Sequence, residues 1–269
     1  MRLICFALKE EASALPPKVW SWQKNKILIT GIGRQNAGKS VREFLNSCGS
    51  RGNETQIKSG KQLETPYVIS YDPHLVLTCG FAGGLNPDLK LGDVVFEVAN
   101  APLAPSLSPP GGERASARTE EGFDEDVGKG IAGDKPEPPH GGCSERLVAA
   151  GARPAKFFCA DHIATTVAEK KKLRDETGAD AVEMESAAIH AVCAERGIPC
   201  ATVRVISDTA NEDLPLDFNT LAKPDKSLDY GKLLLAVAKS PGKIGALMKL
   251  QKQTRFAAER LAEVLVKIL

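Results

Sequence analysis

Acidic residues follow apolar, strand-like segments at three places in this 269-residue chain. Two glutamates lie in the segment Val182-Glu183-Met184-Glu185-Ser186, and Asp208 follows the apolar run 201–206. Glu11 repeats the pattern near the amino terminus, after the run 2–8. In an open parallel α/β sheet the carboxyl ends of the strands meet at one edge, where ligands bind. Carboxyl groups gathered at that edge can act as general acids and bases, so the pattern predicts acid/base chemistry.

Each of these acids also has an ordinary structural explanation. Glu185 comes where a strand gives way to a helix, and a glutamate there can cap the helix or compensate its dipole. Asp208 can stabilise the turn that follows it, and Glu11 can be an acid of a first helical turn. Glu183 points to the same side as Glu185 along an extended segment, and a local ion pair explains it as well as function does. The three positions together favour a functional site.

A glycine-rich motif follows the strand-like segment 26–31. Residues Gly33 to Ser40 match G-x-x-x-x-G-K-S, the pattern of the phosphate-binding loop in nucleoside triphosphatases. The alternative is that Gly31 and Gly33 form a tight turn, while Gly38 lets a helix pack closely on the sheet. A triphosphatase also needs a further acidic strand end that helps to hold magnesium, and the sequence offers no obvious one. The triphosphatase therefore stays an alternative.

Short apolar runs alternate with helical patterns through most of the chain, which is typical of a largely parallel sheet covered by helices. The predicted strands are 2–8, 26–31, 74–79, 93–98, 155–160, 179–184 and 200–207. The predicted helices are 35–46, 144–151, 167–176, 186–196, 226–238 and 243–268. The last helix has apolar residues at helical spacing, which indicates a packed amphipathic helix with an architectural role.

Two segments interrupt this alternation. Residues 47–66 are polar, contain three glycines and predict a mobile connection. Residues 100–143 are crowded with proline, glycine and charged residues, and they predict an exposed or disordered insertion. We expect residues 1–269 to form a single domain around this insertion.

The composition excludes several classes of protein. The formal net charge of +1 is too small to attract nucleic acid or an anionic membrane, so we expect small-molecule partners. No stretch approaches the ~20 apolar residues of a membrane span, and no signal-type cleavage region is evident, so we predict a cytoplasmic location. The seven cysteines form no C-x-x-C pair, and the four histidines lack the spacing of zinc ligands. We therefore expect reduced thiols, no metal and no cofactor.

Six short segments carry a further signal when they are taken in order: Ala7-Leu8-Lys9-Glu10-Glu11, Gly31-Ile32-Gly33, Cys79-Gly80-Phe81-Ala82-Gly83-Gly84-Leu85, Leu91-Gly92-Asp93-Val94-Val95, Val182-Glu183-Met184-Glu185 and Arg204-Val205-Ile206-Ser207-Asp208. Together they resemble the nucleoside phosphorylase and nucleosidase superfamily, which includes the purine and uridine phosphorylases. The chain looks most similar to methylthioadenosine/S-adenosylhomocysteine nucleosidases, with futalosine hydrolases as near relatives. The resemblance runs from residue 1 to about residue 218, except for 47–66 and 100–143. It implies a three-layer α/β/α fold with a central mixed, mostly parallel twisted sheet, and a homo-oligomer.

The resemblance also implies catalytic roles. Glu11 matches the glutamate that activates water, and Glu185 matches the one that binds the ribose hydroxyls, with Met184 packed against the sugar. Asp208 matches the acid that protonates or hydrogen-bonds the departing purine. Breaking an N-glycosidic bond creates positive charge on the sugar and negative charge on the base, so a carboxylate and an acid placed there both favour the transition state.

The other implied contacts to substrate come from several segments. A tight turn at 80–84 is expected to bring its backbone to the ligand, although such a turn can also end a strand without binding anything. The chain has Phe81 where relatives often carry a small hydroxyl residue, and Ile163 where they commonly place an aromatic on adenine. His162 can read a base edge or be structural. The predicted substrate-binding residues are Gly33, Phe81, Ala82, Gly83, His162, Ile163, Glu183, Met184, Glu185, Arg204 and Ser207.

The sequence therefore favours hydrolysis of the N-glycosidic bond of a purine-type nucleoside, such as methylthioadenosine, S-adenosylhomocysteine or futalosine. Glu11 matches the water-activating residue, and the sequence shows no evident pair of arginines that could bind free phosphate. The alternative is a phosphate-dependent nucleoside phosphorylase, with Gly33 and Arg34 as its phosphate contacts. Two further alternatives are the triphosphatase at 33–40 and a non-catalytic nucleoside-binding protein whose site has changed at Phe81 and Ile163.

Overall fold

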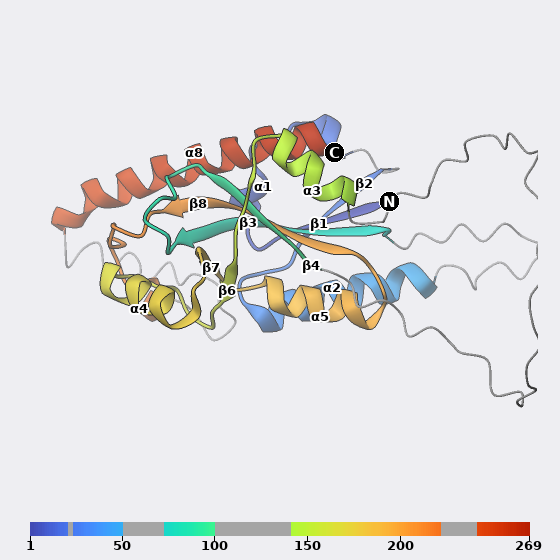
Figure 1. Ribbon diagram of the computed structural model, residues 1–269, viewed down its shortest axis with the longest axis horizontal. Helices are drawn as coiled ribbons and strands as arrows, with labels where there is room; N and C mark the ends of the chain where they lie inside the picture. The colour runs from blue at the N-terminus through green and yellow to red at the C-terminus, as the bar shows by residue number, and fades with distance from the viewer. Residues whose placement is uncertain (21–23, 51–72, 100–140, 222–240) are drawn as a thin grey trace, which may run out of the picture.

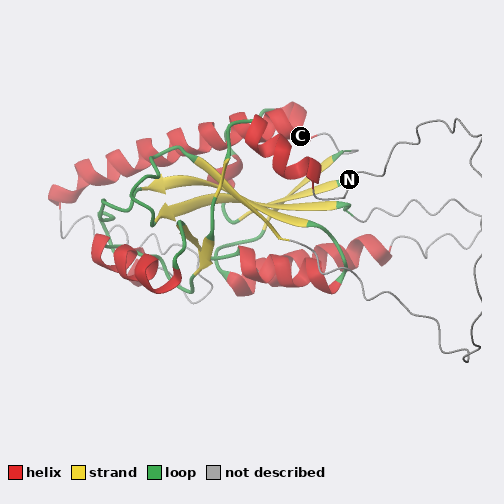
Figure 2. Cartoon of the chain, in the orientation of Figure 1, coloured by secondary structure: helices red, strands yellow, loops and turns green. Residues whose placement is uncertain are grey.

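The computed structural model describes residues 1–20, 24–50, 73–99, 141–221 and 241–269. These residues form one eight-stranded sheet with helices on both faces (Figures 1 and 2). The strands are β1 (Arg2–Phe6), β2 (Asn25–Ile29), β3 (Leu75–Gly84), β4 (Val94–Ala99), β5 (Arg153–Pro154), β6 (Phe157–Cys159), β7 (Ala181–Glu183) and β8 (Cys200–Asp208). The helices are α1 (Lys9–Ala12), α2 (Arg34–Ser50), α3 (Gly141–Ala149), α4 (Val167–Thr177), α5 (Ser186–Glu195), α6 (Phe218–Leu221) and α8 (Ile244–Ile268), with 3₁₀ turns η1 (Pro17–Trp20) and η2 (Pro241–Lys243).

The sheet is mixed and mostly parallel, as predicted. Its main path runs β2-β1-β3-β8-β4-β5, and β7 joins it by pairing with β3 on one side and β6 on the other. Strands β2, β1, β3 and β8 are mutually parallel, whereas β4 is antiparallel to β8. Helices α3 and α8 cover one face, and α2, α4 and α5 lie on the other (Figure 1). This arrangement confirms the predicted three-layer α/β/α fold.

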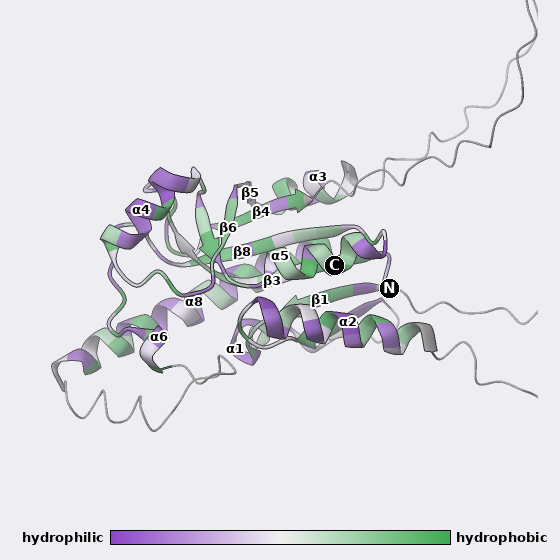
Figure 3. Ribbon diagram, turned by 90° about the horizontal axis from the view of Figure 1, so that it is seen from below, coloured by the Kyte–Doolittle hydropathy of each residue, from purple (hydrophilic) through white to green (hydrophobic). Residues whose placement is uncertain are grey.

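Alternation along β1 explains how two cores form. Leu3 and Cys5 pack with α2 and α5, whereas Ile4 and Phe6 pack with α3 and α8. All four side chains are almost completely buried, because successive residues of a strand point to opposite faces and both faces are covered. Full burial of such a side chain is worth about 1.5–3 kcal/mol. In Figure 3 the strands β4 and β8 are largely hydrophobic, and the helices carry both hydrophilic and hydrophobic residues.

The structure extends the predicted strand 74–79 to Gly84 and so contradicts the tight turn predicted at 80–84. The residues Gly80 to Ala82 pair in register with Arg204 to Ile206 of β8, and the register shifts between Ala82 and Gly83. The backbone groups of this glycine-rich segment therefore find partners in a neighbouring strand that is distant in sequence. A β-bulge takes the place of the turn.

Several other boundaries differ from the prediction. The short elements α1, α6 and β5 were not expected, since four or fewer residues give no periodicity. Of the predicted connection 47–66, residues 47–50 form the end of α2 and 51–66 lie outside the described residues. Of the predicted insertion 100–143, residues 141–143 begin α3 and 100–140 lie outside the described residues. The predicted helix 226–238 also lies outside them.

Candidate active site

A cavity of about 370 Å³ opens where β1, β3 and β8 end. Glu11 belongs to α1, directly after β1, and Asp208 is the last residue of β8. All the predicted site residues line this cavity except Gly33 and Arg204. The parallel strands thus bring together acids that are almost two hundred residues apart in the sequence, as expected from their positions at strand ends.

Glu183 and Glu185 reach the cavity by a different route from the one expected. Strand β7 is antiparallel to β3, with Val182 opposite Gly83, so it runs back along the end of β3. The two glutamates therefore do not lie at the same strand edge as Asp208. Both carboxylates contact the side chain of Arg204, which belongs to β8.

Arg204 is the centre of the charged network behind the cavity. Its Nη2 donates to Glu183 Oε2 at 2.7 Å, to Glu185 Oε2 at 3.1 Å and to Thr78 Oγ1 at 3.3 Å. The side chain is 1% exposed. Burial opposes its positive charge, but Glu183, Glu185 and Glu11 outweigh burial and raise the pKa of Arg204. The guanidinium is therefore a fixed cation that holds carboxylates in place from behind.

Glu183 is an anchor for the start of α5. Its Oε2 accepts from the backbone N–H groups of Glu185 at 2.9 Å and Ser186 at 2.8 Å, and its Oε1 accepts from the Ser186 hydroxyl. Burial alone would raise the pKa of Glu183. Arg204 and these hydrogen bonds together have a larger, opposite effect, so the pKa lies below its ordinary value. The carboxylate stays charged at the helix amino terminus, where negative charge is favourable.

Glu185 occupies the N-cap position of α5 but does not cap the helix with its side chain. Its Oε1 accepts from the backbone N–H of Gly33 at 2.9 Å, while its Oε2 accepts from Arg204. Gly33 has a positive φ of 88°, a conformation that other residues rarely adopt. Burial raises the pKa of Glu185, and Arg204 only partly offsets this effect. Thus the Gly33 backbone orients the glutamate instead of facing the cavity.

Glu11 lines the same cavity and has a strongly altered acidity. Its two carboxylate oxygens accept from the backbone N–H groups of Phe81 at 2.8 Å and Leu8 at 2.9 Å. Burial raises its pKa to about 7, because the stabilising effects of Arg204 and of the two hydrogen bonds are smaller. A carboxyl group of this kind can take a proton from water near neutral pH.

Gly80 makes the approach of Glu11 and Arg204 possible. A Cβ atom at this position would lie 2.5 Å from Glu11 Oε1 and 2.7 Å from Arg204 Nη1. Its φ of 147° is also in the region that favours glycine. Any side chain at position 80 would therefore push apart the two charged groups.

Asp208 is held from two sides. Ser207 Oγ donates to its Oδ1 at 2.9 Å, and Lys170 Nζ lies 2.5 Å from its Oδ2. Lys170 was missed by the sequence reasoning, because it lies in the run Glu169-Lys170-Lys171-Lys172, where nothing distinguishes it from its exposed neighbours. Its burial on α4 is a tertiary property that the residue type does not signal.

One part of the cavity wall is formed by the predicted residues His162 and Ile163 together with Phe218, which the sequence did not predict. His162 lines the cavity, and its Nε2 lies 2.8 Å from Glu169 Oε1. The backbone N–H of Ile163 donates to Asn219 Oδ1 at 2.8 Å, and its carbonyl accepts from Asn219 Nδ2 at 2.9 Å. This amide pair ties α6, with its cavity-lining Phe218, to the segment beside His162. No local sequence signal marks Asn219.

The terminal helix also contributes to the cavity, which corrects its purely architectural assignment. Leu250 and Thr254 of α8 line the cavity, whereas Leu261 and Leu265 of the same helix are buried in the core. One amphipathic helix thus packs with its second half and lines the cavity with its first half. The helical spacing predicted the packing but could not indicate the second contact.

Comparison with known proteins identifies the family of this chain. The family model described as "Phosphorylase superfamily" matches residues 61–238. The chain belongs to the phosphorylase superfamily. This membership confirms the resemblance drawn from the six sequence segments.

Two proteins of known name are similar in sequence to this chain. It is 30% identical over 162 residues to an aminodeoxyfutalosine nucleosidase of Helicobacter pylori, covering 58% of this chain and 64% of that protein. The match thus spans slightly less than two thirds of that relative. It is also 30% identical over 195 residues to a 5'-methylthioadenosine/S-adenosylhomocysteine nucleosidase of Shewanella halifaxensis, covering 71% of this chain and 78% of that protein.

Two solved structures share the fold of this chain. The Campylobacter jejuni 5'-methylthioadenosine/S-adenosylhomocysteine nucleosidase superposes with a TM-score of 0.56 at 18% identity, over 99% of this chain and 97% of that one. The futalosine hydrolase of Helicobacter pylori gives a TM-score of 0.56 at 17% identity, over 99% and 96%. At this identity the likeness concerns the architecture.

The motif at 33–40 does not form a phosphate-binding loop in this member of the phosphorylase superfamily. Helix α2 begins at Arg34, so the residues that would have to wrap around a phosphate are helical. Lys39 is 76% exposed and faces Glu43 one turn along, and Ser40 Oγ donates to the Thr30 carbonyl at 3.1 Å. The structure therefore contradicts the triphosphatase alternative. Gly38 faces Ala188 of α5, so it serves helix–helix packing and not the predicted contact with the sheet.

The described residues contain neither a cluster of metal ligands nor a membrane-spanning helix. Among them, no group of three or more His, Cys, Asp or Glu side chains could hold a metal ion. Nor does the described part of the chain contain a helix with the length and apolar character needed to cross a membrane. All seven cysteines are free thiols.

Proposed function

We propose that this protein hydrolyses the N-glycosidic bond of a purine-type nucleoside. The observation that carries the proposal is Glu11, a buried carboxyl group whose pKa is raised to about 7 and which lines the same cavity as Glu185 and Asp208. Such a group is about half ionised at neutral pH, and its ionised form is basic enough to accept a proton. The similarity to two kinds of nucleosidase supports the same reaction class.

The proposed mechanism assigns one side chain to each reacting part of the substrate. Glu185 accepts hydrogen bonds from the ribose hydroxyls, and Met184 packs against the sugar. As the bond between sugar and base breaks, its electron pair goes to the base, which takes a proton from Asp208. Glu11 removes a proton from the water that attacks the positively charged sugar carbon. Ser207 orients the Asp208 carboxyl group through its 2.9 Å hydrogen bond.

Water is favoured over phosphate as the second substrate because the expected phosphate contacts are already engaged. The Gly33 N–H donates to Glu185, and Arg34 contacts the Cys159 carbonyl and, at 3.4 Å, Asp161. Among the described residues, no lysine or arginine lines the cavity. A phosphate dianion would therefore meet carboxylates but no cation in the cavity lining, which is electrostatically costly.

The same charges argue for a substrate without anionic groups. Glu10, Glu11, Glu183, Glu185 and Asp208 all line the cavity, whose volume of about 370 Å³ suits a small organic molecule. The cavity lining also includes the apolar side chains of Leu8, Leu214, Phe218 and Leu250. We therefore favour a nucleoside with a neutral, apolar substituent, such as methylthioadenosine, over one that carries a carboxylate or phosphate.

Release of free base tests the proposal directly. The purified protein is incubated with methylthioadenosine, S-adenosylhomocysteine, futalosine, adenosine and adenosine monophosphate, each with and without phosphate. We expect release without phosphate, fastest from methylthioadenosine and slowest from the monophosphate. Strict dependence on phosphate would establish the phosphorylase alternative, and binding without release would establish the non-catalytic one. Homo-oligomerisation and a cytoplasmic location stay predictions.

A further inference from the structure

Lys170 is a completely buried lysine in the middle of the charged run at the start of α4. Its side chain is 0% exposed, and its ammonium group lies 2.5 Å from Asp208 Oδ2. It also donates to the carbonyl of Thr209 and to that of Glu212, each at 2.8 Å. A lysine ammonium has three N–H donors, and here each has one acceptor, so the charged form is fully satisfied.

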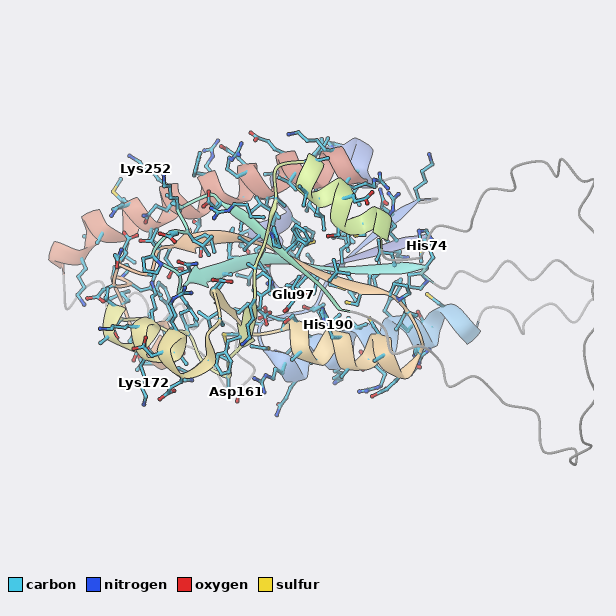
Figure 4. All side chains as sticks on the ribbon, in the orientation of Figure 1. His74, Glu97, Asp161, Lys172, His190 and Lys252 are labelled. Atoms are coloured by element: carbon cyan, nitrogen blue, oxygen red, sulfur yellow. The ribbon has the colours of Figure 1, made fainter. Side chains whose placement is uncertain are left out.

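The neighbouring lysine of the same run shows how specific this burial is. Lys172 is 73% exposed and lies 3.8 Å from Glu176, an arrangement typical of a solvated helix surface. Figure 4 shows Lys172 at the outer side of α4, away from the sheet. Burying a charged group is unfavourable unless partners compensate it. Of these two lysines of α4, Lys170 contacts the candidate acid Asp208 and Lys172 contacts a surface glutamate.

The first turn of α4 and the segment after Asp208 form one hydrogen-bonded unit. The Val167 N–H donates to Asp213 Oδ1 at 2.6 Å, and the Leu214 N–H donates to the Thr165 carbonyl at 2.8 Å. Lys170 adds its two carbonyl contacts to this unit. Its ammonium is consequently fixed with respect to both the backbone and the carboxyl group of Asp208.

We propose that Lys170 is a positioning residue for the leaving-group acid, which it orients and whose carboxylate form it stabilises. The inference rests on the proposed function. When the bond between sugar and base breaks, its electron pair goes to the base and a base nitrogen takes the proton of Asp208. Asp208 is then a carboxylate, and a fixed ammonium faces it without any reorganisation. Lys170 neither gains nor loses a proton in this step.

The test compares two leaving groups in the Lys170→Met variant. A purine needs a proton as it departs, whereas 4-nitrophenolate departs without one, so a 4-nitrophenyl riboside bypasses Asp208. We expect kcat for methylthioadenosine to fall about 10²-fold, the loss typical of a misplaced catalytic group, with little change in KM. For the nitrophenyl riboside we expect a loss of less than about threefold, since no general acid is needed. Lys172→Met is the matched control and should behave as the wild type with both substrates.

A second pair of variants separates positioning from folding. In the Asp208→Asn background, Lys170→Met should cause no further loss, because the two residues act on the same step. If Lys170→Met does not fold, Lys170→Gln, which keeps an N–H donor, takes its place in both comparisons. Equal slowing of both substrates would overturn the inference and leave the proposed function standing. A wild-type protein that releases base from no nucleoside would overturn the proposed function itself.

Discussion

The raised pKa of Glu11 predicts a dependence of stability on pH that one substitution should remove. A pKa of about 7 against an ordinary value of 4.5 corresponds, at about 1.4 kcal/mol per pH unit, to about 3 kcal/mol. Between these two values the folded chain holds a proton that the unfolded chain has released. The free energy of unfolding therefore falls as the pH rises from 4.5, and the loss is complete just above pH 7.

Glu11→Gln is the perturbation that tests this value. A glutamine amide carries no titrating proton, so the variant lacks this part of the pH dependence. Its NH₂ group would face the N–H of either Leu8 or Phe81, which now both donate to the carboxylate, so a constant loss of stability is also expected. The assay is denaturant unfolding of both proteins at several pH values from 4.5 to 8. The difference between their free energies of unfolding should change by about 3 kcal/mol over this range.

The same ionisation should govern catalysis. Because the ionised carboxylate accepts the proton of water, kcat/KM of the wild type should rise with pH and level off above about pH 7. In Glu11→Gln the rate should fall by about 10²–10⁴-fold, the usual contribution of a general base. Two results would refute the reasoning: a stability difference that is the same at pH 4.5 and pH 8, or a wild-type rate that does not change between these values.

Three further substitutions test other parts of the site. Gly80→Ala should lower base release by about 10²-fold, because its Cβ would fall 2.5 Å from Glu11 Oε1, and a wild-type rate would contradict the close approach. Arg204→Met leaves buried carboxylates without their cation and should cost about 3–5 kcal/mol in denaturant unfolding, against less than about 0.5 kcal/mol for the exposed control Arg255→Met. Lys39→Met should leave base release unchanged, since Lys39 is exposed on α2, and a large loss would revive a role for the motif at 33–40.

The layered fold could be predicted because its signals are local. The seven predicted strands all correspond to strands of the structure, since each is a short apolar run bounded by polar residues or glycine. The extent and direction of strands depend on partners that are distant in sequence. Strand β3 continues through Gly80 only because β8 lies beside it, and β7 is antiparallel to β3 although nothing in its three residues specifies this.

The candidate site could be predicted only in part for the same reason. Glu11 and Asp208 could be predicted because each lies at or just after the end of a strand, and the topology of parallel strands brings such positions together. Lys170 and Asn219 were not found, because the first lies in a run of similar residues and the second in a segment without a motif. Their roles come from burial and from contacts across the fold. The phosphate-loop motif failed because a helix begins inside it, at Arg34.

The position of α8 has a practical consequence for altering this protein. The family match ends at residue 238, whereas Leu250 and Thr254 lie beyond it and still form part of the cavity wall. Arg204 and the two glutamates that accept its hydrogen bonds lie within the matched region. A library restricted to positions 250 and 254 can therefore vary the shape of the binding cavity while every charged group stays in place. Engineering of substrate preference is best begun at this helix.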